Sequence, residues 1–441
     1  MIYWAPFLHF YQPPTQFHAV LKKICKESYR PLVKLFMTHP SAKVTVNISG
    51  SLTELLMDHG GDDIVKGLRT IAHRGQLEFV GSSKYHAILP LIPEEEMRRQ
   101  IELNDKTNSF FFKNSYRPKG FFPPEMCYSE RVTAPIAEAG YEWVLLSGIA
   151  CPKPWPMNKV YGLKNNKGKD MRVLFRDDIL SNNISFHGID SKGFLEHLSN
   201  IHKHQQKDGP SAHENDIYVV TAMDAETFGH HIRNWEKLFL QAVYEALAVT
   251  PRTFKKIKQR LCLAKGHKKI LDSVDMSKIK VVTISEIIEH FQKAETVEPK
   301  PSSWSTSDED IAKNSPFPLW NDPNNMIHRY QWEHVNICLE LVNKANDPVS
   351  ITFESKSSAD MARSLMDRAI YSCQWWWASR RPMWDINLIN KGLLLQEEVI
   401  FNAYRALTAS KISDDEKHNY YYKVVAARDI KDKIRDILFK G

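Results

Sequence analysis

Residues 1–290 alternate between short apolar runs and longer stretches with apolar residues at helical spacing. The apolar runs are bounded by turn residues, as buried strands are, and cover residues 2–10, 43–49, 77–83, 120–124, 143–148, 173–177, 217–224 and 279–285. Helical patterns lie between several of them, at residues 17–39, 51–75, 93–114 and 129–140. Strands that alternate with helices predict parallel β-α units, and seven or eight such units predict a closed barrel.

The pattern changes in the last third of the chain. Residues 293–310 are rich in Pro, Ser and Glu and are typical of a linker. Apolar residues then recur at helical spacing over residues 325–345, 358–380, 389–410 and 413–440. We therefore predict an α/β chain with two domains, a parallel barrel over residues 1–295 and a C-terminal α-helical bundle over residues 296–441.

The composition indicates a folded protein without a nucleic-acid or membrane partner. Hydrophobic residues make up 43% and charged residues 25% of the 441 residues, which is ordinary for a globular protein. The basic run at residues 255–269 is interpreted as a solvated helix face, because no nucleic-acid-binding motif accompanies it. A membrane-spanning helix needs about 18 consecutive apolar residues, and the chain contains no such run.

The cysteines and the N-terminus favour a cytoplasmic protein. The six cysteines show neither a CxxC pair nor a short regular spacing, which argues against a zinc ribbon and a disulfide scaffold. The N-terminus has no cationic segment before its short apolar part, so it is a poor signal peptide. We expect reduced thiols, and the sequence predicts no particular oligomeric state.

Polar residues with catalytic chemistry follow the predicted strand at residues 217–224. The stretch "TAMDAETFGHH" places Asp224 and Glu226 two residues apart, so that in an extended segment they point the same way. Paired carboxylates at a strand end can act as acid and base, bind a metal, or cap the next helix. Active sites of parallel barrels lie at this end of the strands.

Other candidates follow other predicted strands at the same end. Two prolines after the apolar residues of "GFFPPEM" fix the backbone just before Glu125, and His9 and Gln12 end the first strand. Glu78 lies within an apolar strand, where a carboxylate is costly unless it is paired or hydrogen-bonded, and His86 lies beyond that strand. A structural pair with an arginine or a histidine is the alternative interpretation of Glu78.

The four segments together resemble a known family. "HFYQP", "GQLEFVG…HAILPLIP", "GFFPPEM" and "MDAETFGHH" are similar, in order and character, to segments of glycoside hydrolase family 57. The resemblance spans roughly residues 1–390. It implies an incomplete parallel (β/α)7 barrel followed by a helical bundle that closes the substrate cleft. It also implies a hydrolase or transglycosylase acting on α-glucans, of the α-amylase or 4-α-glucanotransferase type.

The resemblance further implies a retaining mechanism. Its nucleophile maps to Glu125 and its general acid/base to Asp224, two carboxyl groups that such a mechanism holds about 5–5.5 Å apart. It implies no metal and no cofactor. Candidate sugar-binding residues are His9, Gln12, Glu78, His86, Phe122, Glu226, His231, Trp304, Gln374 and Trp376.

Some positions depart from the family pattern. Tyr11 replaces a second histidine, Phe122 and His231 stand where tryptophan is common, and Gln374 stands where some members have an aspartate. Three consecutive tryptophans in the helical pattern at residues 368–381 sweep about 200° of a helix, so we expect at least one to face the barrel mouth. These departures change the walls that face the sugar and leave the carboxylate pair intact.

Two other functions compete with this one. A metal-dependent polysaccharide deacetylase would bind a divalent cation through an aspartate and two histidines, for which Asp224, His230 and His231 are candidates. Adjacent histidines in an extended segment point apart, which argues against this function. A catalytically silent glucan-binding protein would keep the barrel, but the intact Glu125 and Asp224 argue against it.

Overall fold

The computed structural model describes residues 1–153, 157–163, 170–186, 188–205, 216–248 and 275–440. The chain forms two compact units. The first contains residues 1–12, 16–84 and 93–304, and the second contains residues 13–15, 85–92 and 305 onward. Two short segments from the first quarter of the chain therefore belong to the second unit.

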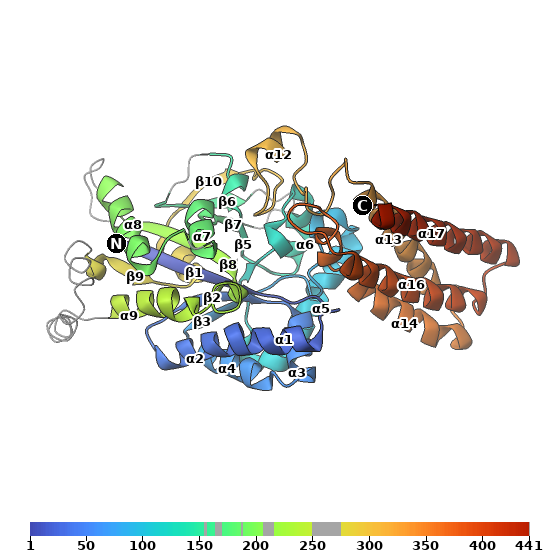
Figure 1. Cartoon of the computed structure of the whole chain (residues 1–441), viewed down its shortest axis with the longest axis horizontal. Helices are drawn as coiled ribbons and strands as arrows, with labels where there is room; N and C mark the ends of the chain where they lie inside the picture. Colours follow the sequence, from blue (N-terminus) through green and yellow to red (C-terminus); the bar gives the residue numbers. More distant parts are fainter. Residues whose placement is uncertain (154–156, 164–169, 187, 206–215, 249–274, 441) are drawn as a thin grey trace. The chain divides into compact units, whose positions relative to one another are not determined.

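The first unit is built on a parallel sheet centred on β1 (Ile2–Phe10). β1 pairs with β8 (Ile217–Asp224), β2 (Val44–Ile48) and β9 (Ile279–Val281), and β2 pairs with β3 (Leu77–Val80) (Figure 1). Every residue of β1 is buried, as expected for a strand of a parallel sheet that is covered on both faces.

A second sheet has the strand order β10-β6-β7-β5-β4. Its strands are β4 (Gly120–Phe121), β5 (Trp143–Leu146), β6 (Val160–Leu163), β7 (Met171–Phe175) and β10 (Lys293–Val297). All neighbours are parallel except β6 and β7.

Hydrogen bonds join the two sheets at two places. Gly81 bonds to Gly120 and Phe122 beyond β3, and the Asp177 amide donates to the Val220 carbonyl of β8. The described strands form a barrel-like arrangement that does not close into a continuous barrel, so the closed barrel predicted from the alternation of strands and helices is wrong. The predicted α/β fold with an incomplete parallel barrel and a helical C-terminal part is confirmed.

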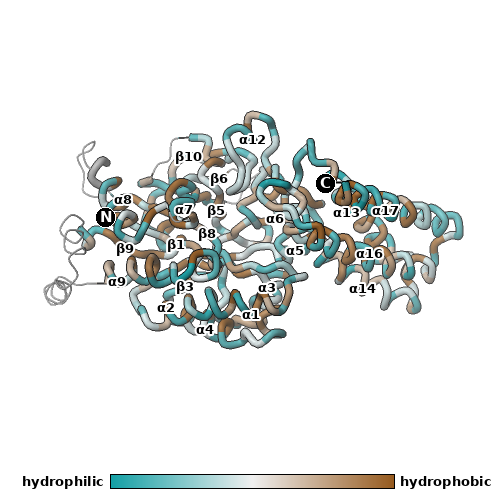
Figure 2. Tube along the Cα trace, in the orientation of Figure 1, coloured by the Kyte–Doolittle hydropathy of each residue, from teal (hydrophilic) through white to brown (hydrophobic). Residues whose placement is uncertain are grey.

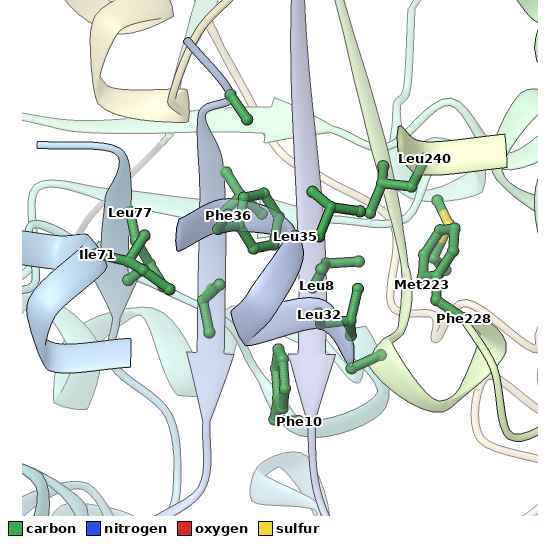
Figure 3. Close-up of a cluster of buried hydrophobic side chains, with 14 of the residues drawn as sticks. Leu8, Phe10, Leu32, Leu35, Phe36, Ile71, Leu77, Met223, Phe228 and Leu240 are labelled. Carbon is green, nitrogen blue, oxygen red and sulfur yellow. The ribbon is translucent and has the colours of Figure 1, made fainter. Parts of the chain in front are cut away.

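Helices cover the sheets of the first unit. They are α1 (His18–Ile24), α2 (Arg30–Thr38), α3 (Gly50–Asp58), α4 (Asp62–His73), α5 (Glu94–Phe112), α6 (Thr133–Glu138), α7 (Asp178–Ser185), α8 (Ser191–Gln205), α9 (Ala242–Ala248) and α11 (Ile284–His290). Leu32, Leu35 and Phe36 of α2 join Leu8 and Phe10 of β1 in one buried apolar cluster (Figure 3). Burial of these side chains stabilises the unit, because buried apolar area contributes about 25 cal/mol per Å².

All eight predicted strand segments contain a strand, but two strands were not predicted. β6 is short, and β10 lies inside the segment predicted to be a linker, so that prediction is wrong over residues 293–297. Most of β10 is exposed, and it pairs with β6 alone at the edge of its sheet. An exposed edge strand needs no apolar run, so hydrophobic periodicity does not reveal it.

The second unit consists of helices. They are α12 (Asp308–Ala312), α13 (Met326–Ala345), α14 (Phe353–Ala369), α15 (Cys373–Trp376), α16 (Ile386–Thr408) and α17 (Asp414–Lys440). Hydrophobic and hydrophilic residues alternate along α16 and α17 (Figure 2), as expected of helices that bury one face. Three of the long helices match the stretches predicted at residues 325–345, 389–410 and 413–440, whereas α14 ends eleven residues before the end of the stretch predicted at residues 358–380.

The helix predicted over residues 368–381 does not form. α14 ends at Ala369, and the four-residue α15 is separate. Trp375 is fully buried and stacks on Trp332 with the ring centroids 4.0 Å apart, whereas Trp376 is partly buried.

Two further expectations concern charge and membranes. The basic run at residues 255–269 lies outside the described residues. Among the helices that the structure describes, none combines the length and the apolar character needed to cross a bilayer.

Gly120 tests the packing between β4 and β5. A Cβ atom at Gly120 would lie 2.1 Å from Cζ2 of Trp143, the residue opposite it in the register, and Trp143 is 1% exposed. We expect Gly120→Ala to lower the free energy of unfolding by about 1–3 kcal/mol. The midpoint of thermal unfolding measures this loss.

The matched control is Gly193→Ala in α8. Gly193 is helical, and the atom nearest to its added Cβ would be a flexible side-chain carbon of Ile189 at 3.1 Å. Alanine is the better helix former by about 1 kcal/mol, so this variant should be neutral or more stable. Equal midpoints for the two variants would contradict the packing argument.

Candidate active site

The register of the first sheet gathers the carboxyl ends of its strands. His9 of β1 lies opposite Asp224 of β8 on one side and Asn47 of β2 on the other. The amide of Phe122 donates to the carbonyl of Gly81, just beyond β3, at 2.9 Å. Residues that follow β1, β4 and β8 therefore reach the same end of the first unit, where open parallel sheets bind their ligands.

The backbone at Glu125 is strained. Glu125 and Met126 both have left-handed conformations, with φ of 58° and 52°, directly after Pro123 and Pro124. Non-glycine residues in this region cost about 1–3 kcal/mol each and persist only where their surroundings enforce them. Such strain is concentrated at functional sites.

Trp304 holds Glu125 through both its backbone and its side chain. The Trp304 amide donates to the Glu125 carbonyl at 3.1 Å, and its indole Nε1 donates to Glu125 Oε2 at 2.7 Å. A bridge between Tyr128 and Ser302, with both backbone hydrogen bonds present, anchors the two segments. These contacts fix the orientation of the Glu125 carboxyl group.

Two carboxyl groups follow one another at the end of β8. β8 ends at Asp224 and a 3₁₀ turn over Ala225–Thr227 follows, so Asp224 and Glu226 do not share one face of an extended strand as the sequence spacing predicted. Glu226 is 5% exposed. Its Oε1 accepts a hydrogen bond from Gln12 Nε2 at 2.8 Å and a very short one from the Tyr29 hydroxyl.

The charge of Asp224 acts on the other two carboxyl groups of the site. Burial, followed by the charge of Asp224, raises the pKa of Glu125 to about 8, while the indole N–H of Trp304 opposes the rise. Burial and then the charge of Asp224 also raise the pKa of Glu226. Burial raises the pKa of Asp224 itself, and the positive charge of Arg176 opposes it. Carboxyl groups that share a site cannot all ionise, so Glu125 carries a proton at neutral pH when no substrate is bound.

Arg176 is a site residue that sequence reasoning missed. It directly follows β7 and is 4% exposed. Its guanidinium donates to the carbonyl of Ala222 and to Asp178 Oδ1, both at 2.8 Å, and lies 5.7 Å from the ring centroid of Trp304. The available signal was an arginine at the end of the predicted strand at residues 173–177.

His9 lies between Asn47 and the aromatic residues of the site. Its Nδ1 and Asn47 Oδ1 are 2.7 Å apart, and its ring centroid is 4.8 Å from that of Phe122 and 6.0 Å from that of Trp304. Burial lowers the pKa of His9 to about 4, so the imidazole is neutral at pH 7. Phe122 is fully buried and packs against His9 and Phe7.

Residues 7–298 match the sequence profile of Glycosyl hydrolase family 57, which is more than half of the chain. The protein belongs to glycosyl hydrolase family 57. The match covers the segments that carry Glu125, Asp224 and Glu226.

Curated family 57 relatives match a limited part of this chain. Alpha-amylase 1 of Dictyoglomus thermophilum is 34% identical over 146 residues, 33% of this chain and 21% of that protein. The 4-alpha-glucanotransferase of Thermococcus litoralis is 32% identical over 139 residues, 32% of this chain and 20% of that protein. The matched region thus spans about a fifth of the length of these relatives.

Solved structures share the fold over nearly the whole chain. The GH57-type branching enzyme of Pyrococcus horikoshii has a TM-score of 0.68 at 14% identity, covering 98% of this chain and 94% of that one. The 4-alpha-glucanotransferase of Thermococcus litoralis has a TM-score of 0.64 at 21% identity, covering 92% and 59%. At these identities the likeness establishes the family 57 fold.

Glu78 lies within β3, before the carboxyl end of the strand where the other candidates from β1 and β8 lie. It pairs with Thr45, two residues before the level of Asn47 and Val80 in the register. Its carboxylate accepts bonds from the Thr45 hydroxyl at 3.1 Å and from the Ser285 amide at 3.2 Å, and a short one from the Ser285 hydroxyl. The partners of Glu78 that the structure shows are two hydroxyls and an amide, rather than the arginine or histidine of the structural pair considered for it.

The loop after β8 contains His231 and His230, the two histidines considered as metal ligands. His231 is exposed to solvent, and its backbone amide donates to the Glu226 carbonyl at 2.8 Å. His230 Nδ1 bonds to Glu27 Oε2 at 2.7 Å. Within the part of the chain that the structure describes, no three His, Cys, Asp or Glu side chains form a group that could hold a metal ion.

Three other candidates belong to the second unit. His86 and Gln374 are fully buried, and Trp376 is partly buried. His86 Nδ1 lies 2.8 Å from Ser372 Oγ. The Gln374 amide donates to the Ala369 carbonyl at 2.6 Å and accepts from Gln396 at 2.5 Å, so its polar groups are engaged in the core of the bundle.

The raised pKa of Glu125 has a measurable effect on stability. Below about pH 4 the carboxyl group is protonated in both the folded and the unfolded chain, and its contribution is fully present. Between that pH and about 8 the unfolded chain ionises while the folded site keeps its proton, so stability falls as pH rises. Glu125→Gln removes this titration and should be more stable than the parent at pH 8 by about 1 kcal/mol or more, with little difference at pH 4.

Thermal unfolding at the two pH values measures this difference. The exposed Glu95 of α5 provides the control, because Glu95→Gln changes the same functional group outside the site. A Glu125→Gln effect that is the same at pH 4 and pH 8 would contradict the raised pKa.

Proposed function

We propose that this protein is a retaining glycoside hydrolase or transglycosylase that acts on α-glucans. Family 57 membership carries the proposal, together with the two carboxyl groups that end β8 and follow β4 within electrostatic reach of each other. The matched relatives named alpha-amylase and 4-alpha-glucanotransferase supply the α-glucan substrate class.

The proposed roles divide the reaction into two displacements. Glu125 attacks the anomeric carbon while Asp224 gives its proton to the departing oxygen, which leaves a glycosyl-enzyme. Asp224 then takes a proton from water or from an acceptor hydroxyl, whose oxygen attacks the same carbon and releases Glu125. Water as acceptor gives hydrolysis, and a sugar as acceptor gives transfer.

The roles require a proton distribution opposite to that of the substrate-free site. Glu125 must be ionised and Asp224 protonated when the bond breaks, whereas burial and the Asp224 charge keep Glu125 protonated in the free protein. Positive charge develops at the anomeric carbon in the transition state and favours an ionised Glu125. The departing oxygen favours a proton on Asp224. The reaction therefore needs one proton to move from Glu125 to Asp224 before the bond breaks.

The surrounding residues suit sugar hydroxyls. His9 is neutral at pH 7 and Glu226 is held by Gln12, so both present fixed polar groups beside Asp224. We propose that His9 and Glu226 bind hydroxyls of the sugar whose bond is broken, and that Trp304 orients Glu125. The substrate is an oligo- or polysaccharide.

A product profile from maltoheptaose tests this function. We expect the protein to form shorter oligosaccharides, accompanied by longer ones if it transfers, and Glu125→Gln to reduce the rate by about a thousandfold or more. Glu95→Gln should keep the parent rate. Retention of the parent rate by Glu125→Gln would overturn the role of Glu125, and absence of product from maltoheptaose, glycogen and amylopectin would overturn the α-glucan substrate.

A further inference from the structure

The helical segment before β2 contains a π-helical turn. Residues 18–38 form a continuous helical run in which α1 passes into the π-helical turn Cys25–Tyr29 and then into α2. A second described π-helical turn, Glu236–Gln241, precedes α9. π-helical turns are rare and occur frequently at functional sites. The loop that follows β8, residues 225–235, directly precedes this second turn in the sequence.

Three consecutive side chains of the first turn bond to that loop. Glu27 Oε2 lies 2.7 Å from His230 Nδ1, and Ser28 Oγ donates to the carbonyl of Ala225 at 2.8 Å. The Tyr29 hydroxyl donates to Glu226 Oε1 in the shortest contact of the three. The turn therefore holds the loop at Ala225, at Glu226 and at His230.

The loop backbone also approaches the turn closely. Gly229 has a φ of 108°, and a Cβ atom there would lie 2.0 Å from the Glu27 carbonyl oxygen. Only glycine permits this conformation and this approach. Apolar packing adds to the contact, because Phe228 of the loop and Leu32 of α2 lie in the same buried cluster (Figure 3).

Glu226 is fixed from a second direction by Gln12. Gln12 Nε2 donates to the oxygen that Tyr29 also contacts, and Gln12 Oε1 accepts from Gln16 Nε2 at 2.7 Å. Tyr29 is fully buried with its ring centroid 5.0 Å from that of Phe10, so it has little freedom to move. The hydrogen bonds from Gln12 and Tyr29 thus fix the orientation of the Glu226 carboxyl group.

We propose that the π-helical turn Cys25–Tyr29 is the support that positions the carboxyl groups after β8, with Tyr29 as its principal positioning residue. Tyr29 holds Glu226, and the clamped loop fixes the chain on the C-terminal side of Asp224. Tyr29 is fully buried and acts through Glu226. The kinetic consequence of this inference rests on the proposed function, since a misplacement of about 1 Å can cost a hundredfold in rate.

Tyr29→Phe removes the hydroxyl and keeps the ring. We expect kcat on maltoheptaose to fall by about tenfold to a hundredfold while KM changes less than about threefold, because the substrate still binds but the carboxyl groups are no longer held. We also expect amide hydrogen exchange across residues 226–232 to accelerate by about tenfold or more. If the hydroxyl had only a structural role, its removal would lower thermal stability and leave both kcat and KM of the folded protein unchanged.

Tyr244→Phe is the matched control. Tyr244 is also buried, and its hydroxyl donates to the Lys43 carbonyl at 2.8 Å, just before β2 begins and therefore at the opposite end of the strands. It should lose similar thermal stability without a change in kcat or in exchange at residues 226–232. Ser28→Ala, which removes a smaller contact with the same loop, gives a second variant if Tyr29→Phe does not fold.

The two readouts separate this inference from the proposed function. An inactive parent protein would overturn the α-glucan function, and the exchange measurement would still decide whether the turn holds the loop. Unchanged exchange at residues 226–232 in Tyr29→Phe, or an unchanged kcat in an active protein, would overturn the positioning role. An equal kcat loss in Tyr244→Phe would also overturn it.

Discussion

Burying three carboxyl groups together is the constraint on which the rest of this site depends. An ionised carboxylate removed from water costs several kcal/mol unless charges or hydrogen bonds compensate. Each of the three has a different compensating partner: Trp304 for Glu125, Arg176 for Asp224, and Tyr29 with Gln12 for Glu226. The compensation is incomplete, because the pKa values of all three groups remain raised. Incomplete compensation is what leaves a proton available for acid catalysis.

The strands determine where these groups meet, and irregular segments determine how they are held. The parallel register of β1 with β8 and β2 brings Asp224, His9 and Asn47 to one level. The orientation of the side chains then depends on features outside regular strands and helices: the left-handed Glu125, the π-helical turn Cys25–Tyr29 and the backbone of Gly229. The left-handed conformation of Glu125 costs stability locally and is maintained by the packed framework around it.

The sequence predicted the framework well because hydrophobic periodicity reports burial. Eight strand segments and the C-terminal helices α13, α16 and α17 were recognised in this way. The exposed edge strand β10 carries no such signal and was assigned to a linker. The break between α14 and α15 was also missed, since the apolar residues around Trp375 continue a helical spacing that the backbone does not follow.

The site was predictable only in part. Strand-end position indicated Glu125, Asp224 and His9, but the partner of each depends on contacts between distant parts of the chain. Tyr29 reaches Glu226 across 197 residues, and no local pattern in a single sequence encodes that pairing. The same reason explains why Gln374 was proposed as a sugar ligand, although Gln396 occupies its amide oxygen in the core of the bundle.

Azide rescue tests the central claim, the division of roles between Glu125 and Asp224. α-Maltosyl fluoride supplies a leaving group that departs without acid assistance. With azide present, Asp224→Ala should yield the α-glycosyl azide, because azide attacks a glycosyl-enzyme formed on Glu125, and Glu125→Ala should yield the β-glycosyl azide by direct displacement. Exchange of the two products between the variants would contradict the assigned roles, as would the same anomer from both.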